Sequence, residues 1–226
     1  MEHQYKLTAP FEEWVQSSLD HPPKEPEWYW GADFDSFWGS LRMSDAATVE
    51  YLTRLFLEPR HLKPYSLEQI AQGIWFLIGD SSPSKAMYAL LEVSVDVEKR
   101  IACIRAMSEF FRNFVSPATD GDAETDSDPF DMACYMWWDI VPLRPWRGKA
   151  LEGEPEIHDA CVTVMAEVLE LPSDVCRLSA LHGLNHWQEH YTEHVERVID
   201  AFLRSPEEVT PRVREYATKA RAGLCE

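Results

Sequence analysis

The chain has 226 residues, enough to enclose a full hydrophobic core within one large domain. Its 39 acidic residues against 21 basic ones give a formal net charge of -18 at pH 7. Such a charge repels phosphate backbones and anionic lipid surfaces, which argues against nucleic acid and membranes as partners. Many acidic chains are acidic only for solubility. The alternative is an acidic face that selects a basic protein partner.

Residues 1–14 lack the charged start and continuous apolar stretch of a secretory signal, and no apolar run approaches membrane-spanning length. The 5 cysteines are odd in number and form no Cys-x-x-Cys pair. This spacing argues against both a disulfide framework and a thiolate zinc site. We therefore expect a cytoplasmic protein with reduced thiols.

Apolar residues recur at helical spacing through most of the chain after residue 44, whereas strand-like alternation is nearly absent. One segment follows the i, i+3, i+4, i+7, i+8 pattern of an amphipathic helix at Cys161, Val164, Met165, Val168 and Leu169. The pattern predicts helices over residues 9–20, 33–42, 44–57, 66–79, 84–92, 96–115, 129–139, 156–171, 173–187, 192–204 and 210–222.

Residues typical of helix ends agree with these boundaries. Ser66 with Gln69 predicts a capping box, in which each side chain bonds the other residue's backbone N–H. Pro211 after Thr210 suits a first helical turn, and Gly223 suits a C-terminal stop.

Two interruptions and one connector divide the chain. The proline-rich stretch 22–28 and the acidic stretch 118–129 are predicted loops, the second of them mobile. The connector 141–156 contains three prolines and two glycines. We expect a single all-α domain, residues 1–226, with an N-terminal helical block 1–140 and a C-terminal block 155–226.

The pattern of the C-terminal block predicts successive helix pairs, in the stretches SDVCRLSALHGLNHW, EHVERVIDAFL and PRVREYATKARAG. These stretches resemble HEAT-type α-helical repeats, particularly those ending uncharacterised bacterial proteins. The resemblance implies antiparallel helix pairs forming a HEAT-like bundle or a short α-α superhelix. It also implies a scaffold or binding surface without catalytic residues. The tryptophan-rich N-terminal half departs from a regular array.

Four histidines recur at a constant stride of four, at His182, His186, His190 and His194. On one unbroken helix each step drifts only about 40°, so neighbours lie about 6 Å apart along one face. One divalent metal ion could take two adjacent histidines, with Glu189 or Glu193 as an extra oxygen ligand. The series would span about 18 Å, which excludes four ligands to one ion.

A turn between two paired helices offers a different interpretation of this series. Thr192 can cap a helix that begins at Glu193, which would interrupt the series between His186 and Thr192. The histidines would then be ordinary surface or core side chains, and folding would require no metal. The His-Glu-x-x-His pattern of zincin proteases is absent.

The adjacent pair His158 and Asp159 resembles the motif of HD-type phosphohydrolases, whose His and Asp side chains bind divalent metals that activate water. The resemblance also requires an upstream His and a downstream Asp. The only nominal partners are His61 and Asp200, and their spacing does not fit. The simpler account is that Asp159 favours the first turn of a helix.

The chain has 9 tryptophans, including the adjacent pair Trp137 and Trp138. Adjacent residues on a helix do not share a face, so at least one of these rings must meet a neighbouring segment or a partner. Core packing is one interpretation. The other is an aromatic anchor on a partner-binding surface.

A phosphate loop, a nucleophile elbow, a dinucleotide fingerprint and a catalytic Cys-His pair are all missing from the chain. The sequence therefore predicts a non-catalytic helical module whose acidic surface binds a basic protein partner, and toxin neutralisation is one concrete form of this activity. The alternative is a metal-dependent hydrolase of HD-like type that uses His158, Asp159 and part of the His182 to His194 series. No cofactor is expected beyond a divalent metal at these histidines.

Overall fold

A computed structural model of the chain describes residues 9–31, 43–119, 128–145, 153–205 and 209–225. Every regular element within these ranges is a helix, which confirms the predicted all-α class for the described part of the chain. The elements are α1 (Phe11–Leu19), η1 (Trp28–Trp30), α3 (Asp45–Leu57), η3 (Pro59–Leu62), α4 (Leu67–Ile78), η4 (Ala86–Leu91), α5 (Val97–Phe110), η5 (Phe111–Val115), α6 (Ser116–Ala118), α7 (Pro129–Tyr135), α8 (Trp137–Ile140), α9 (Glu154–Leu169), α10 (Asp174–Arg204) and α11 (Pro211–Arg221).

Most predicted helices are present, with four differences in detail. The two helices predicted over 173–187 and 192–204 form the single kinked helix α10. The segment predicted as a helix over 84–92 forms the 3-10 helix η4. The helix predicted over 96–115 is α-helical as far as Phe110 and continues through the π-helical turn η5. The helix predicted over 129–139 is divided at Met136 into α7 and α8. The predicted helix 33–42 and most of the predicted loop 118–129 lie outside the described residues.

The predicted helix ends are formed by local hydrogen bonds. Ser66 Oγ accepts from the Gln69 backbone N–H at 3.2 Å, and Gln69 Oε1 accepts from the Ser66 N–H at 3.0 Å, which completes the capping box. Thr210 Oγ1 accepts from the Val213 N–H at 3.3 Å. Gly223 has a φ of 67°, a conformation that glycine adopts without steric cost.

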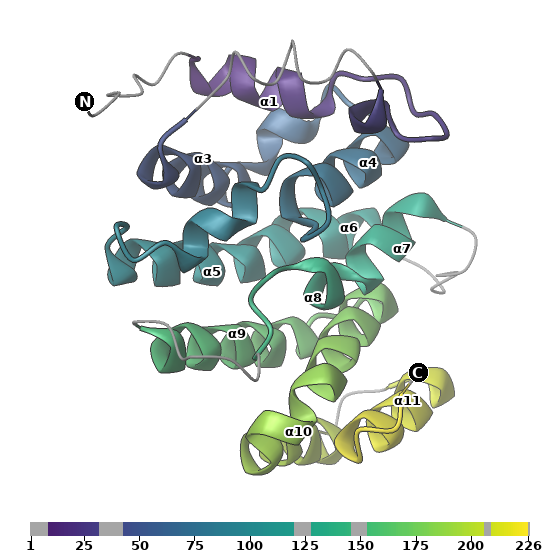
Figure 1. The fold of residues 1–226 in the computed structure, drawn as a ribbon. Coiled ribbons are helices and arrows are strands. Elements are labelled where there is room, and N and C mark those ends of the chain that lie inside the picture. Colours follow the sequence, from purple (N-terminus) through teal and green to yellow (C-terminus); the bar gives the residue numbers. More distant parts are fainter. Residues whose placement is uncertain (1–8, 32–42, 120–127, 146–152, 206–208, 226) are drawn as a thin grey trace.

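The helices are stacked in chain order, from α1 at one end of the molecule to α11 at the other (Figure 1). In the N-terminal half, α3 packs on α5, and α4 packs on α1 and α7. In the C-terminal half the neighbours are consecutive, because α9 packs on α10 and α10 on α11. Helix α5 also packs on α9, so a single cluster of buried apolar side chains reaches from α1 to α11. No helix of the described residues is both long enough and apolar enough to cross a membrane.

Helix α10 is kinked at Tyr191, whose φ of -128° and ψ of 40° are not helical. The kink falls in the interval between His186 and Thr192 where the sequence allowed an interruption. Thr192 Oγ1 donates to the backbone carbonyl of Gln188 at 2.8 Å. The Thr192 side chain therefore bonds to the residue four positions earlier, across the kink. The sequence had suggested instead that Thr192 caps the helix that follows.

A glycine lets α10 approach α8 and α9 closely. A Cβ atom at Gly183 would lie 2.6 Å from Trp138 Cβ and 2.6 Å from Met165 Sδ, well inside van der Waals contact. Only a residue without a side chain fits at this position. The contact fixes the distance between α10 and α8, and α8 also contains Asp139.

Candidate functional site

The histidine series does not form one site, because its members face different neighbours. His182 and His186 lie beside Asp139 of α8. After the kink, His194 Nδ1 lies 3.9 Å from Asp159 Oδ1 of α9. His190 is exposed, and its charge is a minor cause of the lowered pKa of His158 on α9, of which burial is the main cause. The first two histidines of the series therefore meet α8, and the last meets α9.

The first pair and Asp139 bring three potential metal ligands together. His182 Nε2 and His186 Nε2 are 3.2 Å apart, and His186 Nε2 is 3.5 Å from Asp139 Oδ1. One ligand atom from each residue lies within 4.8 Å of the other two. We call these three residues the His-Asp cluster.

Neighbouring polar groups hold the cluster in place. Tyr216 of α11 places its Oη 2.9 Å from His182 Nδ1, and the Tyr135 Oη lies 2.7 Å from the Tyr216 Oη. On the other side, Arg144 Nη1 donates to Asp139 Oδ1 at 2.8 Å. Residues from three segments (α7, the turn after α8, and α11) thus orient the side chains of the cluster.

Burial keeps both imidazoles of the cluster neutral at pH 7. Burial is the main reason why the pKa of His182 is lowered to about 4; the neighbouring His186 also contributes to the lowering, and Asp139 opposes it. Burial is also the main reason why the pKa of His186 is lowered. His182 is only 5% exposed, but the side chains of His186 and Asp139 are 31% and 26% exposed. The cluster is therefore reached from solvent on the side of these two residues.

Sequence reasoning missed Asp139 as the oxygen ligand of this cluster. It considered Glu189 and Glu193, which are close in sequence, whereas the carboxylate comes from α8. One feature of the sequence could have identified Asp139. Asp139 is the one charged residue between Met132 and Leu143, in an otherwise apolar run that includes both adjacent tryptophans. A charged residue in such a run needs a polar partner when the run is buried.

His158 and Asp159 are adjacent on α9 but have different surroundings. His158 is buried, with its Nδ1 2.6 Å from Tyr191 Oη and its Nε2 3.6 Å from Glu154 Oε1. The side chain of Asp159 is 73% exposed. These two side chains therefore do not point into one enclosed site.

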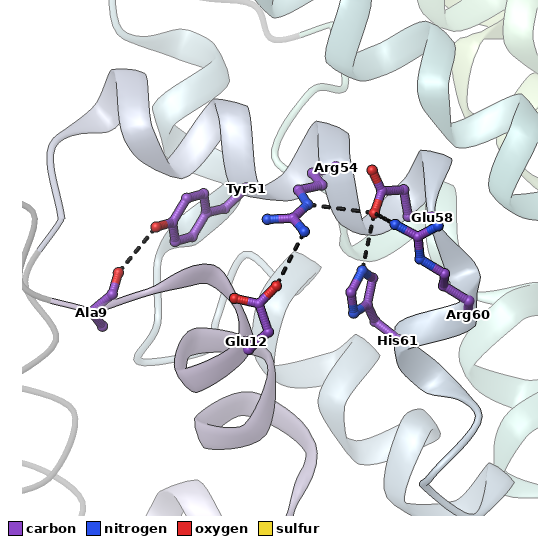
Figure 2. A network of polar contacts seen from close by, with 7 residues as sticks. All are labelled: Ala9, Glu12, Tyr51, Arg54, Glu58, Arg60 and His61. Carbon is purple, nitrogen blue, oxygen red and sulfur yellow. Dashed lines mark hydrogen bonds and ion pairs between the residues drawn. The ribbon is translucent and has the colours of Figure 1, made fainter.

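The two nominal partners of an HD-type site contact other residues. His61 Nε2 lies 3.0 Å from Glu58 Oε2, in a network that also contains Arg54 and joins α3 to α1 (Figure 2). Asp200 accepts from Arg221 Nε at 2.6 Å. The contacts of His61 and Asp200 thus match ordinary ion pairs, which agrees with the poor spacing in the sequence.

Trp137 and Trp138 are both 0% exposed. Trp137 packs against Phe56, Phe110 and Phe111, with ring centroids 5.2 to 5.7 Å apart. Trp138 lies against α10 at Gly183. The structure therefore places both rings in the core, where no partner can contact them. A partner-binding role at this pair does not fit that burial, because the two opposite faces of α8 are both covered by neighbouring helices.

An acidic groove lies between the proline-rich stretch 22–28, α4 and α7. It has a volume of about 430 Å³. Its charged lining consists of Glu25, Glu27 and Glu68 with one basic residue, Lys24, and its apolar lining includes Trp75, Pro129 and Met132. Gln72 Nε2 donates to the backbone carbonyl of Lys24 at 2.8 Å, which holds the proline-rich segment against α4.

No family model matches the chain, and comparisons with curated proteins and with solved structures also found no match. The resemblance to HEAT-type repeats therefore stays a prediction from the sequence.

Proposed function

We propose that the protein is a non-catalytic helical module that binds a basic segment of another protein in the acidic groove. One observation carries this proposal: Glu25, Glu27 and Glu68 line a groove that also contains the partly buried ring of Trp75. A lysine or arginine side chain can lay its apolar stem on such a ring and place its charge among the carboxylates. The volume of about 430 Å³ lies within the range of ligand sites in proteins.

The net charge of the whole chain also favours a basic protein as the partner. Its formal charge of -18 attracts a basic protein over distances beyond the groove itself. We further propose that the stacked helices form a HEAT-like array, because α9, α10 and α11 pack consecutively. Cys103, Cys134, Cys161 and Cys176 are free and buried, which is compatible with action in the cytoplasm. Neutralisation of a basic toxin is one activity that such a module could perform.

The proposal is tested by removing two charges from the groove. The partner is first captured from the native cells and purified, and its affinity is then measured by calorimetry. Glu27→Gln with Glu68→Gln should weaken binding at least about tenfold, since charge-assisted hydrogen bonds contribute about 1.5–3 kcal/mol each. The matched control is Glu156→Gln with Glu170→Gln, which removes two exposed charges, one in the first turn of α9 and one at its C-cap. Equal losses in both double variants, or an acidic partner, would refute the groove as the binding site.

The second candidate is the metal-dependent hydrolase that uses His158, Asp159 and part of the histidine series. One observation favours it: His194 approaches Asp159 at 3.9 Å. Phosphoester hydrolysis by the metal-loaded protein, abolished by Asp159→Asn, would favour this candidate over the binding module.

A further inference from the structure

We propose that Asp139, His182 and His186 bind one divalent transition-metal ion, Zn²⁺ being the best fit, through both Nε2 atoms and a carboxylate oxygen. The ligands come from α8 and from the part of α10 before its kink. This inference is independent of the acidic groove and of the proposed partner.

Two of the three distances between ligand atoms match a tetrahedral ion, and the third, between His182 and Asp139, is at most 4.8 Å. Zn²⁺ binds imidazole nitrogen and carboxylate oxygen at about 2.0–2.2 Å, so two ligands of a tetrahedral ion lie about 3.3–3.5 Å apart. The two Nε2 atoms are 3.2 Å apart, and His186 Nε2 lies 3.5 Å from Asp139 Oδ1. An ion therefore fits between the side chains with small rotations.

A network without metal is the main rival explanation, since Asp139 already accepts from Arg144. A hydrogen-bond network without metal uses the hydrogen-bonding capacity of the three side chains less completely than an ion would. Both imidazoles are neutral, so a proton on His186 Nε2 can point at His182 Nε2 or at Asp139 Oδ1, but not well at both. An ion accepts a lone pair from each of the three atoms at once.

The surroundings of His182 also suit a metal ligand. With the ion on Nε2, the proton of the ring is on Nδ1, which can donate to Tyr216 Oη at 2.9 Å. The Tyr216 hydroxyl can in turn donate a hydrogen bond to Tyr135 Oη at 2.7 Å. Metal-binding histidines commonly donate their second N–H to such a partner, which fixes the ring orientation.

The ligand set also limits the choice of ion. Two imidazoles and one carboxylate suit Zn²⁺ or Co²⁺, whereas Ca²⁺ and Mg²⁺ prefer oxygen ligands alone. Three protein ligands leave at least one position for water or for a group supplied from outside. That position faces the side where His186 and Asp139 are partly exposed.

The test uses the full chain without an affinity tag, first freed of metal with a chelator. Zn²⁺ is titrated by calorimetry, and Co²⁺ by its visible absorption, which is intense when the ion is tetrahedral. One ion per chain is expected. On the wild type, the imidazole nitrogen resonances assigned to His182 and His186 should shift on addition of Zn²⁺, while those of His190 and His194 should not.

Variants then assign the ligands. His186→Gln and Asp139→Asn should each weaken Zn²⁺ binding by more than 100-fold, and Tyr216→Phe by about 10- to 100-fold, because it removes the acceptor of the Nδ1 proton. The matched control is His190→Ala with His194→Ala, which removes a pair of the same spacing on the same helix. It should leave the affinity unchanged.

Several results would overturn the proposal. The absence of stoichiometric Zn²⁺ binding would do so, as would binding that survives Asp139→Asn or is lost in the His190→Ala, His194→Ala control. The nitrogen shifts on the wild type decide the assignment even if a variant fails to fold, because they require no substitution. Shifts confined to His190 and His194 would show adventitious binding by the wrong pair.

Discussion

The histidines of α10 are buried to different extents by neighbouring helices, and this burial lowers the pKa of the first two. His182 is almost fully buried, and its pKa is lowered to about 4, mainly because burial disfavours the charged ring. The partial burial of His186 lowers its pKa as well. The neutral state of these two rings at pH 7 is thus a property of the packing between α10, α8 and α11.

This burial predicts how stability depends on pH in the presence of a chelator. The ordinary pKa of His182 is 6.5, and its folded pKa is about 4. The unfolded chain therefore binds more protons between these values, so the free energy of unfolding should fall as the pH is lowered from about 6.5 to about 4. Above pH 7 the contribution of His182 should be complete and constant.

Urea unfolding at pH 7, 6 and 5 measures this effect. The matched variant is His182→Gln, which keeps a side chain able to bond Tyr216 but does not titrate. The wild type should lose more stability than the variant between pH 7 and pH 5. Parallel pH profiles for the two proteins would show that His182 titrates normally in the fold.

At the scale of elements, the contact between α8 and α10 depends on Gly183. Gly183→Ala should gain up to about 1 kcal/mol of helix propensity. It would also place a methyl group 2.6 Å from Trp138 Cβ, which cannot rotate away. Overpacking of this kind costs about 1–3 kcal/mol, so the net effect should be a loss of stability. Because Asp139 follows Trp138, Zn²⁺ affinity should fall as well.

Gly73→Ala is the control for this prediction. There the new methyl group would meet mainly the flexible end of Leu19, which can move aside. Its thermal stability should change less than that of Gly183→Ala, and its Zn²⁺ affinity should not change. If the two variants lost equal stability, the close approach of α10 to α8 would not be the cause.

The sequence was sufficient where structure depends on residues close in the chain. The capping box of Ser66 and Gln69 lies within one helical turn, and both of its hydrogen bonds are present. The sequence also placed an interruption between His186 and Thr192, but the structure has a kink at Tyr191 within α10 and not the predicted turn between two helices. Asp139 was not identified, because its closeness to His186 depends on how α8 packs on α10. The burial of both adjacent tryptophans depends on the same long-range packing.

For the whole molecule, the two candidate sites share helix α7. Residues of α4 and α7 line the acidic groove, while the His-Asp cluster on α8 and α10 has Tyr135 of α7 and Tyr216 of α11 beside it. All these helices contribute to one apolar core. Charge is a property of the whole chain, and a net charge of -18 would attract the basic partner that we propose before any contact forms.

This long-range attraction predicts how association with the partner depends on salt. The screening length falls from about 10 Å at 0.1 M salt to about 3 Å at 1 M, so the association rate constant should fall about tenfold or more over this range. The dissociation rate should change much less, because it depends on contacts already formed.

Stopped-flow mixing with the purified partner gives both rate constants. Glu27→Gln with Glu68→Gln should raise the dissociation rate, because it removes contacts within the groove. Glu156→Gln with Glu170→Gln should change the association rate slightly and leave the dissociation rate unchanged. An association rate that is indifferent to salt would mean that the acidity of the chain serves its solubility and does not steer a basic partner to the groove.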